Sequence, residues 1–155
     1  MSINPPNPHK SINKVTINGF MMGSLFFVLT LIITLDPYKF SPFVIYELVL
    51  AIPLLYVASL AYSKLGYYPN VKYWSRFGWI LNALGNLFVI NAVGLVTAKF
   101  DLRLSLVYFF MFCTLMIIYT FINATHNKEI WHRKVLKLIF TLSIIFFGGI
   151  LLILS

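Results

Sequence analysis

The hydrophobic residues of this chain are gathered into five long runs, and the short segments between them carry almost all of the charges. The runs cover residues 17–35, 42–62, 77–98, 104–122 and 138–154. A helix rises about 1.5 Å per residue, so a hydrocarbon core about 30 Å thick requires about 20 residues, close to the length of each run. Strands of a membrane barrel would alternate in polarity over about 10 residues, which these runs do not. The pattern predicts an all-α integral membrane protein, a bundle of five transmembrane helices.

Composition strengthens this prediction. Of the 155 residues, 60% are hydrophobic and 10% are charged, with a mean hydropathy of +0.87. A soluble domain has about 25% charged residues, and a single core in so short a chain cannot hide this much apolar surface from water. We expect the surplus to face lipid. The sequence predicts one domain, residues 17–155, after a flexible cytoplasmic tail, residues 1–16, which holds three of the seven prolines.

The Lys and Arg residues are unevenly distributed between the two sides of the predicted bundle. Nine fall on the side of the amino end, namely Lys10, Lys14, Lys64, Lys72, Arg76, Lys128, Arg133, Lys134 and Lys137. Three fall on the other side, namely Lys39, Lys99 and Arg103. Cytoplasmic loops retain positive charge. We therefore expect a multi-pass protein of the cell membrane, with its amino end in the cytoplasm and its carboxyl end outside.

The net charge of +8 follows from the same distribution. The cations are spread through membrane-flanking segments rather than gathered in one basic domain, so nucleic acid is not an expected partner. The expected partners are membrane lipids, above all anionic headgroups at the cytoplasmic face, where each cation contributes about 1 kcal/mol of attraction. The single cysteine, Cys113, excludes an intrachain disulfide and lies within the fourth run.

A possible metal site is raised by His126, Glu129 and His132, which stand at intervals of three residues. Two imidazoles and a carboxylate are suitable ligands for zinc or iron. The pattern lacks the spacing of four residues between the histidines of the HExxH motif. Lys128 and Arg133 would also surround a metal cation with like charge. We predict a solvated segment that contacts lipid headgroups, and no metal.

Other catalytic and cofactor chemistry finds little support along the chain. None of the five runs contains a histidine, which disfavours intramembrane haem. The sequence also shows no glycine-rich phosphate loop, no nucleophile elbow and no paired carboxylates. We therefore predict no cofactor and no catalytic residue.

Glu47 is the only acidic residue well inside a run. A carboxyl group at that depth is costly unless it faces protein or water. Glu47, Ala51, Leu54, Ala58 and Ala61 form one stripe at helical spacing, and the small residues of this stripe permit close approach of another helix. We expect Glu47 to point into the bundle in its neutral form.

The third run contains most of the remaining polar residues. These are Gly78, Asn82, Gly85 and Asn86 on one face, and Asn91 on nearly the opposite face. A helix that is polar on two faces is expected to be central. Asn91, and Tyr108 of the fourth run, lie at the depth of Glu47. We predict a polar cluster in which Glu47 donates a hydrogen bond to Asn91 or accepts one from Tyr108. The cluster either holds the bundle together or binds a proton, a cation or a polar ligand.

Two pairs of glycines are candidates for close helix packing. Gly19 and Gly23 form a GxxxG pattern in the first run, and Gly148 and Gly149 are adjacent in the fifth. Such pairs serve contacts within a chain or with a second copy of it. A homo-oligomer or a larger membrane complex therefore stays open.

Three functional hypotheses follow from these observations. The favoured one is an accessory or scaffold membrane protein without an evident catalytic site. The first alternative is a small oligomeric transporter or channel that uses Glu47 together with Asn82, Asn86 and Asn91. The second alternative is a lipid-modifying membrane enzyme that uses Glu47 or the histidine segment, and enzymatic activity is the less favoured expectation.

Overall fold

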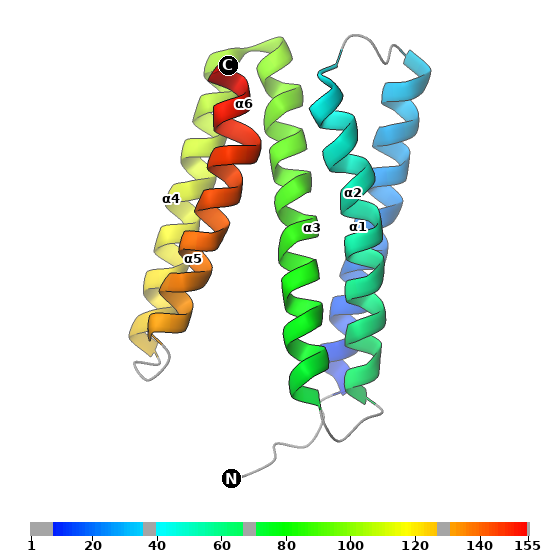
Figure 1. Cartoon of the computed structure of the whole chain (residues 1–155), viewed down its shortest axis with the longest axis vertical. Helices are drawn as coiled ribbons and strands as arrows, with labels where there is room; N and C mark the ends of the chain where they lie inside the picture. The colour runs from blue at the N-terminus through cyan, green and yellow to red at the C-terminus, as the bar shows by residue number, and fades with distance from the viewer. Residues whose placement is uncertain (1–7, 36–39, 67–70, 127–130, 155) are drawn as a thin grey trace.

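The computed structural model describes residues 8–35, 40–66, 71–126 and 131–154, and the regular structure in these ranges is entirely helical. The long helices are α1 (Pro8–Leu35), α2 (Pro42–Ser63), α3 (Val71–Phe100), α4 (Leu102–His126) and α5 (Trp131–Ile145). A 3-10 turn, η2 (Lys64–Gly66), extends α2. A π turn, η4 (Phe146–Ile150), and the short α6 (Leu151–Leu154) continue α5. Together these elements make five long helical segments, which alternate in direction along the chain (Figure 1).

Each of the five helical segments is long and apolar enough to cross a membrane. The segments concerned are Ile12–Thr34, Pro42–Ser63, Lys72–Phe100, Leu102–Asn123 and Trp131–Leu154. Continuous apolar runs form helices because a helix satisfies every backbone hydrogen bond within the segment itself. The predicted all-α class and the five potential membrane-spanning helices are confirmed.

The helices extend further than the apolar runs. α1 begins at Pro8, so residues 8–16 of the predicted tail are helical. Proline fits the first turn of a helix, where its missing N–H would have had no partner. α3 begins at Val71 and α5 at Trp131, each several residues before its apolar run. Several of the cations expected in loops therefore project from the end turns of helices.

The turn between α3 and α4 is also shorter than the sequence indicated. Asp101 alone separates the two helices, and its Oδ1 accepts a hydrogen bond of 2.8 Å from the Arg103 N–H. This is the bond of an N-cap, which satisfies one of the free N–H groups at the start of a helix. α3 and α4 are consequently antiparallel neighbours.

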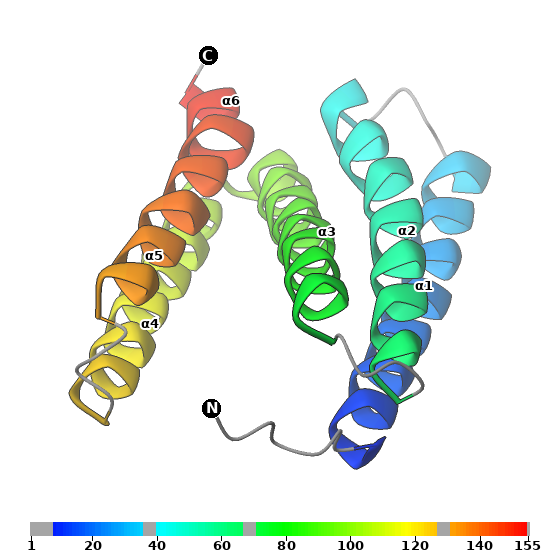
Figure 2. The same cartoon turned by 60° about the horizontal axis from the view of Figure 1, so that its bottom comes forward.

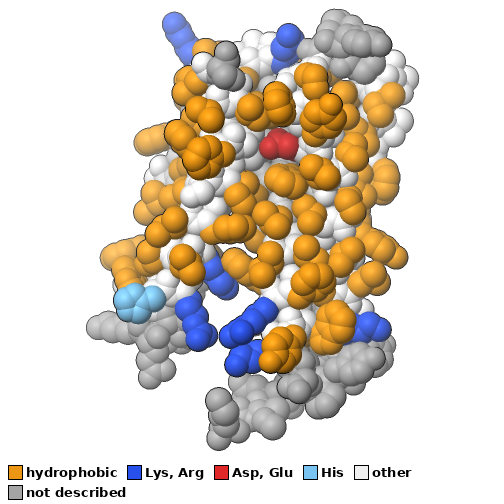
Figure 3. Space-filling view, in the orientation of Figure 1, with side chains coloured by type: hydrophobic (Ala, Val, Ile, Leu, Met, Phe, Trp, Pro, Cys, Tyr) orange, Lys and Arg blue, Asp and Glu red, His pale blue; other side chains and the backbone are white. Residues whose placement is uncertain are grey.

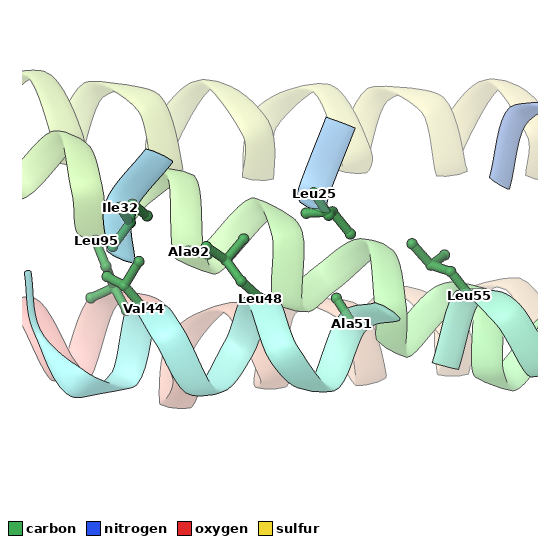
Figure 4. Close-up of a cluster of buried hydrophobic side chains, with 8 residues drawn as sticks. All are labelled: Leu25, Ile32, Val44, Leu48, Ala51, Leu55, Ala92 and Leu95. Carbon is green, nitrogen blue, oxygen red and sulfur yellow. The ribbon is translucent and has the colours of Figure 1, made fainter. Parts of the chain in front are cut away.

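The main hydrophobic core lies among α1, α2 and α3. It is formed by Leu25, Ile32, Val44, Leu48, Ala51, Leu55, Ala92 and Leu95 (Figure 4). A Cβ at Gly85 of α3 would lie 2.8 Å from the Leu55 Cγ, so the glycine permits the close approach of α2 and α3. A second, smaller cluster of Leu87, Phe109 and Ile145 joins α3 to α4 and α5.

Helix α3 lies between the α1–α2 pair and the α4–α5 pair (Figure 2). The expectation that the third run is central is therefore confirmed. We call the end of the bundle at which α3 passes into α4 the closed end. The opposite end, at which α1, α3 and α5 begin, is the basic end.

The described cations are concentrated at the basic end. Those at the basic end are Lys14, Lys64, Lys72, Arg76, Arg133, Lys134 and Lys137, and those at the closed end are Lys99 and Arg103. Figure 3 shows Lys and Arg side chains at both ends of one face, and mainly hydrophobic side chains between them. The uneven charge distribution expected from the sequence is therefore carried by opposite ends of one bundle.

Candidate functional site

Glu47 and Asn91 meet between α2 and α3. The Nδ2 of Asn91 donates a hydrogen bond of 3.2 Å to Oε1 of Glu47. Asn91 is completely buried and Glu47 is 8% exposed. On the stripe that contains Glu47, Ala51, Ala58 and Ala61 are also buried, so the predicted inward orientation of Glu47 is confirmed.

Asn91 also contacts the fifth helical segment. Its Nδ2 donates a second hydrogen bond, of 3.2 Å, to the backbone carbonyl of Ile144. Ile144 lies two residues before η4, in which the Leu151 N–H donates to the Phe146 carbonyl five residues back. A π turn disturbs the regular helical ladder and leaves nearby carbonyls accessible to outside donors. Asn91 thus joins the Glu47 side chain of α2 to the Ile144 carbonyl of α5.

The glycines of η4 pack directly against this pair. A Cβ at Gly148 would lie 2.4 Å from Nδ2 of Asn91 and 3.1 Å from Oε1 of Glu47. A Cβ at Gly149 would lie 2.5 Å from Cζ of Phe109 in α4. Of the two alternatives for Gly148 and Gly149, the structure shows packing within the chain.

The GxxxG pattern of α1 behaves differently. A Cβ at Gly19 or at Gly23 meets no atom within 4 Å among the described residues outside its own helical surroundings. These glycines therefore lie on an outward face of α1 and, among the described residues, do not serve packing within the chain.

Tyr108 lies beside the cluster but does not pair with Glu47. Its hydroxyl donates a hydrogen bond of 3.2 Å to the carbonyl of Ile90 in α3. Of the two predicted partners of Glu47, Asn91 is the one observed, and it is the donor and not the acceptor of the bond. The prediction for Tyr108 is wrong, because its hydroxyl holds α4 against α3.

Asn82 and Asn86 are half-buried on α3. Among the described residues, no hydrogen bond joins either of them to Glu47 or Asn91, and the buried Oδ1 of Asn86 has no partner. Asn86 precedes Asn91 by five residues, about 7.5 Å along the helix axis. The predicted polar cluster is thus reduced to Glu47, Asn91 and the Ile144 carbonyl.

Two oxygens of the cluster remain without a partner in the part of the chain that the structure describes. These are Oε2 of Glu47 and Oδ1 of Asn91, and both atoms are buried. A buried polar atom without a hydrogen bond costs about 1–3 kcal/mol. This cost is the one feature of the site that a purely structural role does not explain.

Two buried polar contacts were not anticipated from the sequence. The Nδ2 of Asn18 in α1 donates a hydrogen bond of 3.5 Å to the Leu55 carbonyl in α2. The Oγ of Ser105 in α4 donates a hydrogen bond of 2.8 Å to the Gly94 carbonyl in α3. Asn18 is the only amide side chain in the first apolar run, and this would have been the signal for an inward position.

The histidine segment is only partly described. Glu129 lies outside the described residues, the side chain of His126 is not described, and His132 is exposed at the start of α5. Among the described side chains, no group of three or more His, Cys, Asp or Glu residues is arranged to hold a metal ion. The absence of a metal from this segment stays a prediction.

Two cavities lie toward the basic end, beside α3 and α5. The smaller, of about 250 Å³, is lined by Trp79, Met116, Tyr119, Thr120, Asn123, Lys134, Lys137, Leu138 and Thr141. The larger, of about 480 Å³, is lined by Lys14, Ser75, Arg76, Trp79, Ile80, Arg133, Leu136 and Lys137. We call the larger one the basic cavity. Trp79 and Lys137 line both cavities, and the Lys137 Nζ lies 3.9 Å from the centroid of the Trp79 rings.

Comparison with known proteins finds no family model that matches the chain, no similar curated protein and no similar solved structure. The fold itself defines the class: an all-α bundle of five helices with the length and hydropathy of membrane spans.

Proposed function

We propose that this chain is a multi-pass protein of the cell membrane that acts as an accessory or scaffold protein. Its amino end faces the cytoplasm and its carboxyl end faces the outside. The accessory or scaffold role is supported by the way in which the buried polar groups are paired with one another. Asn91 binds Glu47 of α2 and the Ile144 carbonyl of α5, so the cluster joins three helices.

Membrane insertion is supported by the surface of the bundle. Large apolar side chains are exposed on its outer faces, among them Phe20 at 79%, Phe110 at 73% and Phe147 at 65%. In water these side chains would form apolar patches that soluble monomers rarely expose, whereas lipid acyl chains accommodate them. The excess of cations at one end supports the proposed orientation.

The orientation is tested with single cysteines in a Cys113→Ser background. A cysteine at Lys10 or Lys128 is expected to be shielded from an impermeant reagent added to intact cells, and a cysteine appended after Ser155 is expected to react. Permeabilised cells provide the control, since all three positions must then be labelled. Equal labelling of positions 128 and 155 in intact cells would contradict the five-span orientation.

The structural role of Glu47 is tested by Glu47→Gln. The amide keeps an oxygen that accepts the Asn91 hydrogen bond, so we expect the free energy of unfolding in detergent to change by less than about 1 kcal/mol. Glu47→Leu removes the acceptor and is expected to cost more than the amide variant. A scaffold protein should also purify in mild detergent as a homo-oligomer or as part of a larger complex.

The transporter or channel remains the alternative, and it is favoured by one observation. The buried Oε2 of Glu47 and Oδ1 of Asn91 lack partners among the described residues. Polar atoms of this kind are suited to bind a proton or a cation. In liposomes, a transporter would show a pH-dependent flux that Glu47→Gln abolishes while the fold persists. No flux for either protein would support the accessory role. The lipid-modifying enzyme has no specific observation in its favour.

A further inference from the structure

The basic cavity brings together cations from three helices. Lys14 comes from α1, Arg76 from α3, and Arg133 and Lys137 from α5. None of the described residues that line this cavity is acidic. The two described acids are used elsewhere, because Glu47 binds Asn91 and Asp101 caps α4 at the closed end. Four like charges around one space of about 480 Å³ favour an anion inside it.

Two of these cations are held against aromatic rings. The Nζ of Lys14 lies 4.2 Å from the ring centroid of Tyr62, and the Nζ of Lys137 lies 3.9 Å from that of Trp79. Cation–π contacts restrict the positions of the ammonium groups. The site is thus partly arranged before an anion enters it.

The two arginines indicate which anion fits. A guanidinium group presents parallel N–H donors that match the oxygens of a phosphate, and arginine is favoured wherever phosphate is bound in this way. Arg76 and Arg133 line the cavity from different helices, so a phosphate between them would be contacted from two sides. Figure 3 shows Lys and Arg side chains on both sides of the hollow near the basic end.

The cavity also has an apolar part, formed by Trp79, Ile80 and Leu136. Leu136 is 68% exposed, so this part is open toward the surroundings of the bundle. A soluble phosphate would leave these side chains uncovered, whereas an acyl chain would cover them. Basic pockets between membrane helices on the cytoplasmic side are suited to anionic headgroups.

We propose that the basic cavity is a specific site for one anionic phospholipid, whose phosphate lies between Arg76 and Arg133 and whose acyl chains extend along Ile80 and Leu136. The inference rests on the membrane insertion proposed above, but it goes further than a general attraction between cations and headgroups. The proposed site predicts saturable binding that depends on which positions carry the cations, and not on the total number of cations.

The test compares two variants that lose the same charge at the same end of the bundle. Arg76→Gln with Arg133→Gln removes two cations of the cavity, and Lys64→Gln with Lys72→Gln removes two that do not line it. Binding of phosphatidylglycerol and of phosphatidylcholine with identical acyl chains is measured by native mass spectrometry of the protein released from detergent. We expect the unaltered protein to bind one phosphatidylglycerol with at least about a tenfold preference.

The expected loss follows from the attraction per cation, which strengthens binding about fivefold for each Lys or Arg near a headgroup. The arginine pair of substitutions should therefore weaken phosphatidylglycerol binding about 30-fold, and the lysine pair should change it less than about threefold. Arg76→Lys with Arg133→Lys keeps the charge but removes the paired N–H donors, so binding should weaken less than in the glutamine pair while the preference for phosphatidylglycerol persists. If the glutamine pair fails to fold, the comparison of this lysine-for-arginine variant with the unaltered protein still tests the proposal.

Four outcomes would overturn the proposal. Equal binding of the two lipids by the unaltered protein would remove the site, and equal losses in the two glutamine pairs would leave only diffuse attraction. Full displacement of phosphatidylglycerol by inorganic phosphate or glycerol phosphate would identify a soluble anion as the ligand instead of a lipid. Loss of preference in the lysine-for-arginine variant would contradict a site based on charge. Failure of membrane insertion is distinguishable, because the chain would then be absent from the membrane fraction altogether.

Discussion

The two ends of α3 differ in how the helix meets α4 and α5. At the closed end, Gly94 of α3 lies against Phe109, since a Cβ at Gly94 would fall 2.1 Å from Cζ of its ring. The Ser105 hydroxyl binds the Gly94 carbonyl in the same region. At the basic end, Trp79 of α3 faces Lys137 of α5, and cavities of about 250 and 480 Å³ lie beside them. The cavity at the closed end, of about 420 Å³, lies toward the start of α2 and α6 and not at the contact of Gly94 with Phe109.

The difference shows what decides helix separation in a bundle of this kind. Both ends of α3 are regular helix, so backbone geometry does not distinguish them. Between helices in lipid, association depends on van der Waals packing and hydrogen bonds, because acyl chains are as apolar as the side chains. Glycine and serine bring the helices together at the closed end. At the basic end, Gly78 packs closely against α2, whereas Trp79 and Arg76 of α3 meet Arg133 and Lys137 of α5 around a cavity.

The largest effect is expected from Gly94→Ala. Its new methyl group would overlap the ring of Phe109, which is 1% exposed. We expect a loss of about 3 kcal/mol in the free energy of unfolding, at the upper part of the range for overpacked cores. The measurement is unfolding in mixed micelles, followed by circular dichroism.

The control for this variant is Gly23→Ala in α1, where the added Cβ meets no described atom within 4 Å beyond its own helical surroundings. It should leave stability unchanged or raise it by up to about 1 kcal/mol, since alanine favours helix. Phe109→Leu combined with Gly94→Ala should recover part of the loss. Equal stability of Gly94→Ala and the unaltered protein would show that the closed end is not tightly packed.

An intermediate effect is expected from Asn91→Ala. The substitution leaves Oε1 of Glu47 and the Ile144 carbonyl without their donor. Buried acceptors that lose their partner cost about 2 kcal/mol, and the same unfolding measurement reports it.

Asn86→Ala is the matched control on the same helix, because the buried Oδ1 of Asn86 has no hydrogen-bond partner among the described residues. It should cost less than about 1 kcal/mol. If the two asparagine variants were equally destabilised, the cluster around Glu47 would not be what joins α2, α3 and α5.

The smallest effect is expected at the basic end, from Lys137→Met. The thioether side chain keeps most of the length of lysine but loses the cation over Trp79. Exposed cation–π contacts contribute about 0.5–1 kcal/mol, so the loss should stay within this range. Lys72→Met, at an exposed position of the same end, should have almost no effect. A loss above about 2 kcal/mol for Lys137→Met would show that the basic end is packed as firmly as the closed end.

Much of the architecture could be predicted from local properties of the chain. The apolar runs identified five helices and their antiparallel order, and the small residues around Glu47 indicated its inward face. The match in depth between Glu47 and Asn91 was also available, because the rise per residue of a helix is constant. These inferences need only the order of residues along each helix.

The sequence was less informative about helix ends. The first helix begins at Pro8 rather than after residue 16, and Asp101 alone connects α3 and α4. Hydropathy locates the lipid-sized part of a helix, but polar residues with ordinary helix propensity continue it into the interface. Capping contacts such as that of Asp101 then set the end.

The partners of individual polar groups were decided only by the tertiary structure. Depth placed Tyr108 near Glu47, yet its hydroxyl binds the Ile90 carbonyl, and Asn91 binds Ile144 beside a π turn that no sequence pattern indicated. The rotation of each helix about its axis depends on which small residues allow close approach, here Gly94, Gly148 and Gly149. The sequence by itself determined the number, class and depth of the helices, because these follow from one segment at a time. Rotation and separation are properties of packed pairs, so only the folded bundle decided which polar atoms meet and where the basic cavity lies.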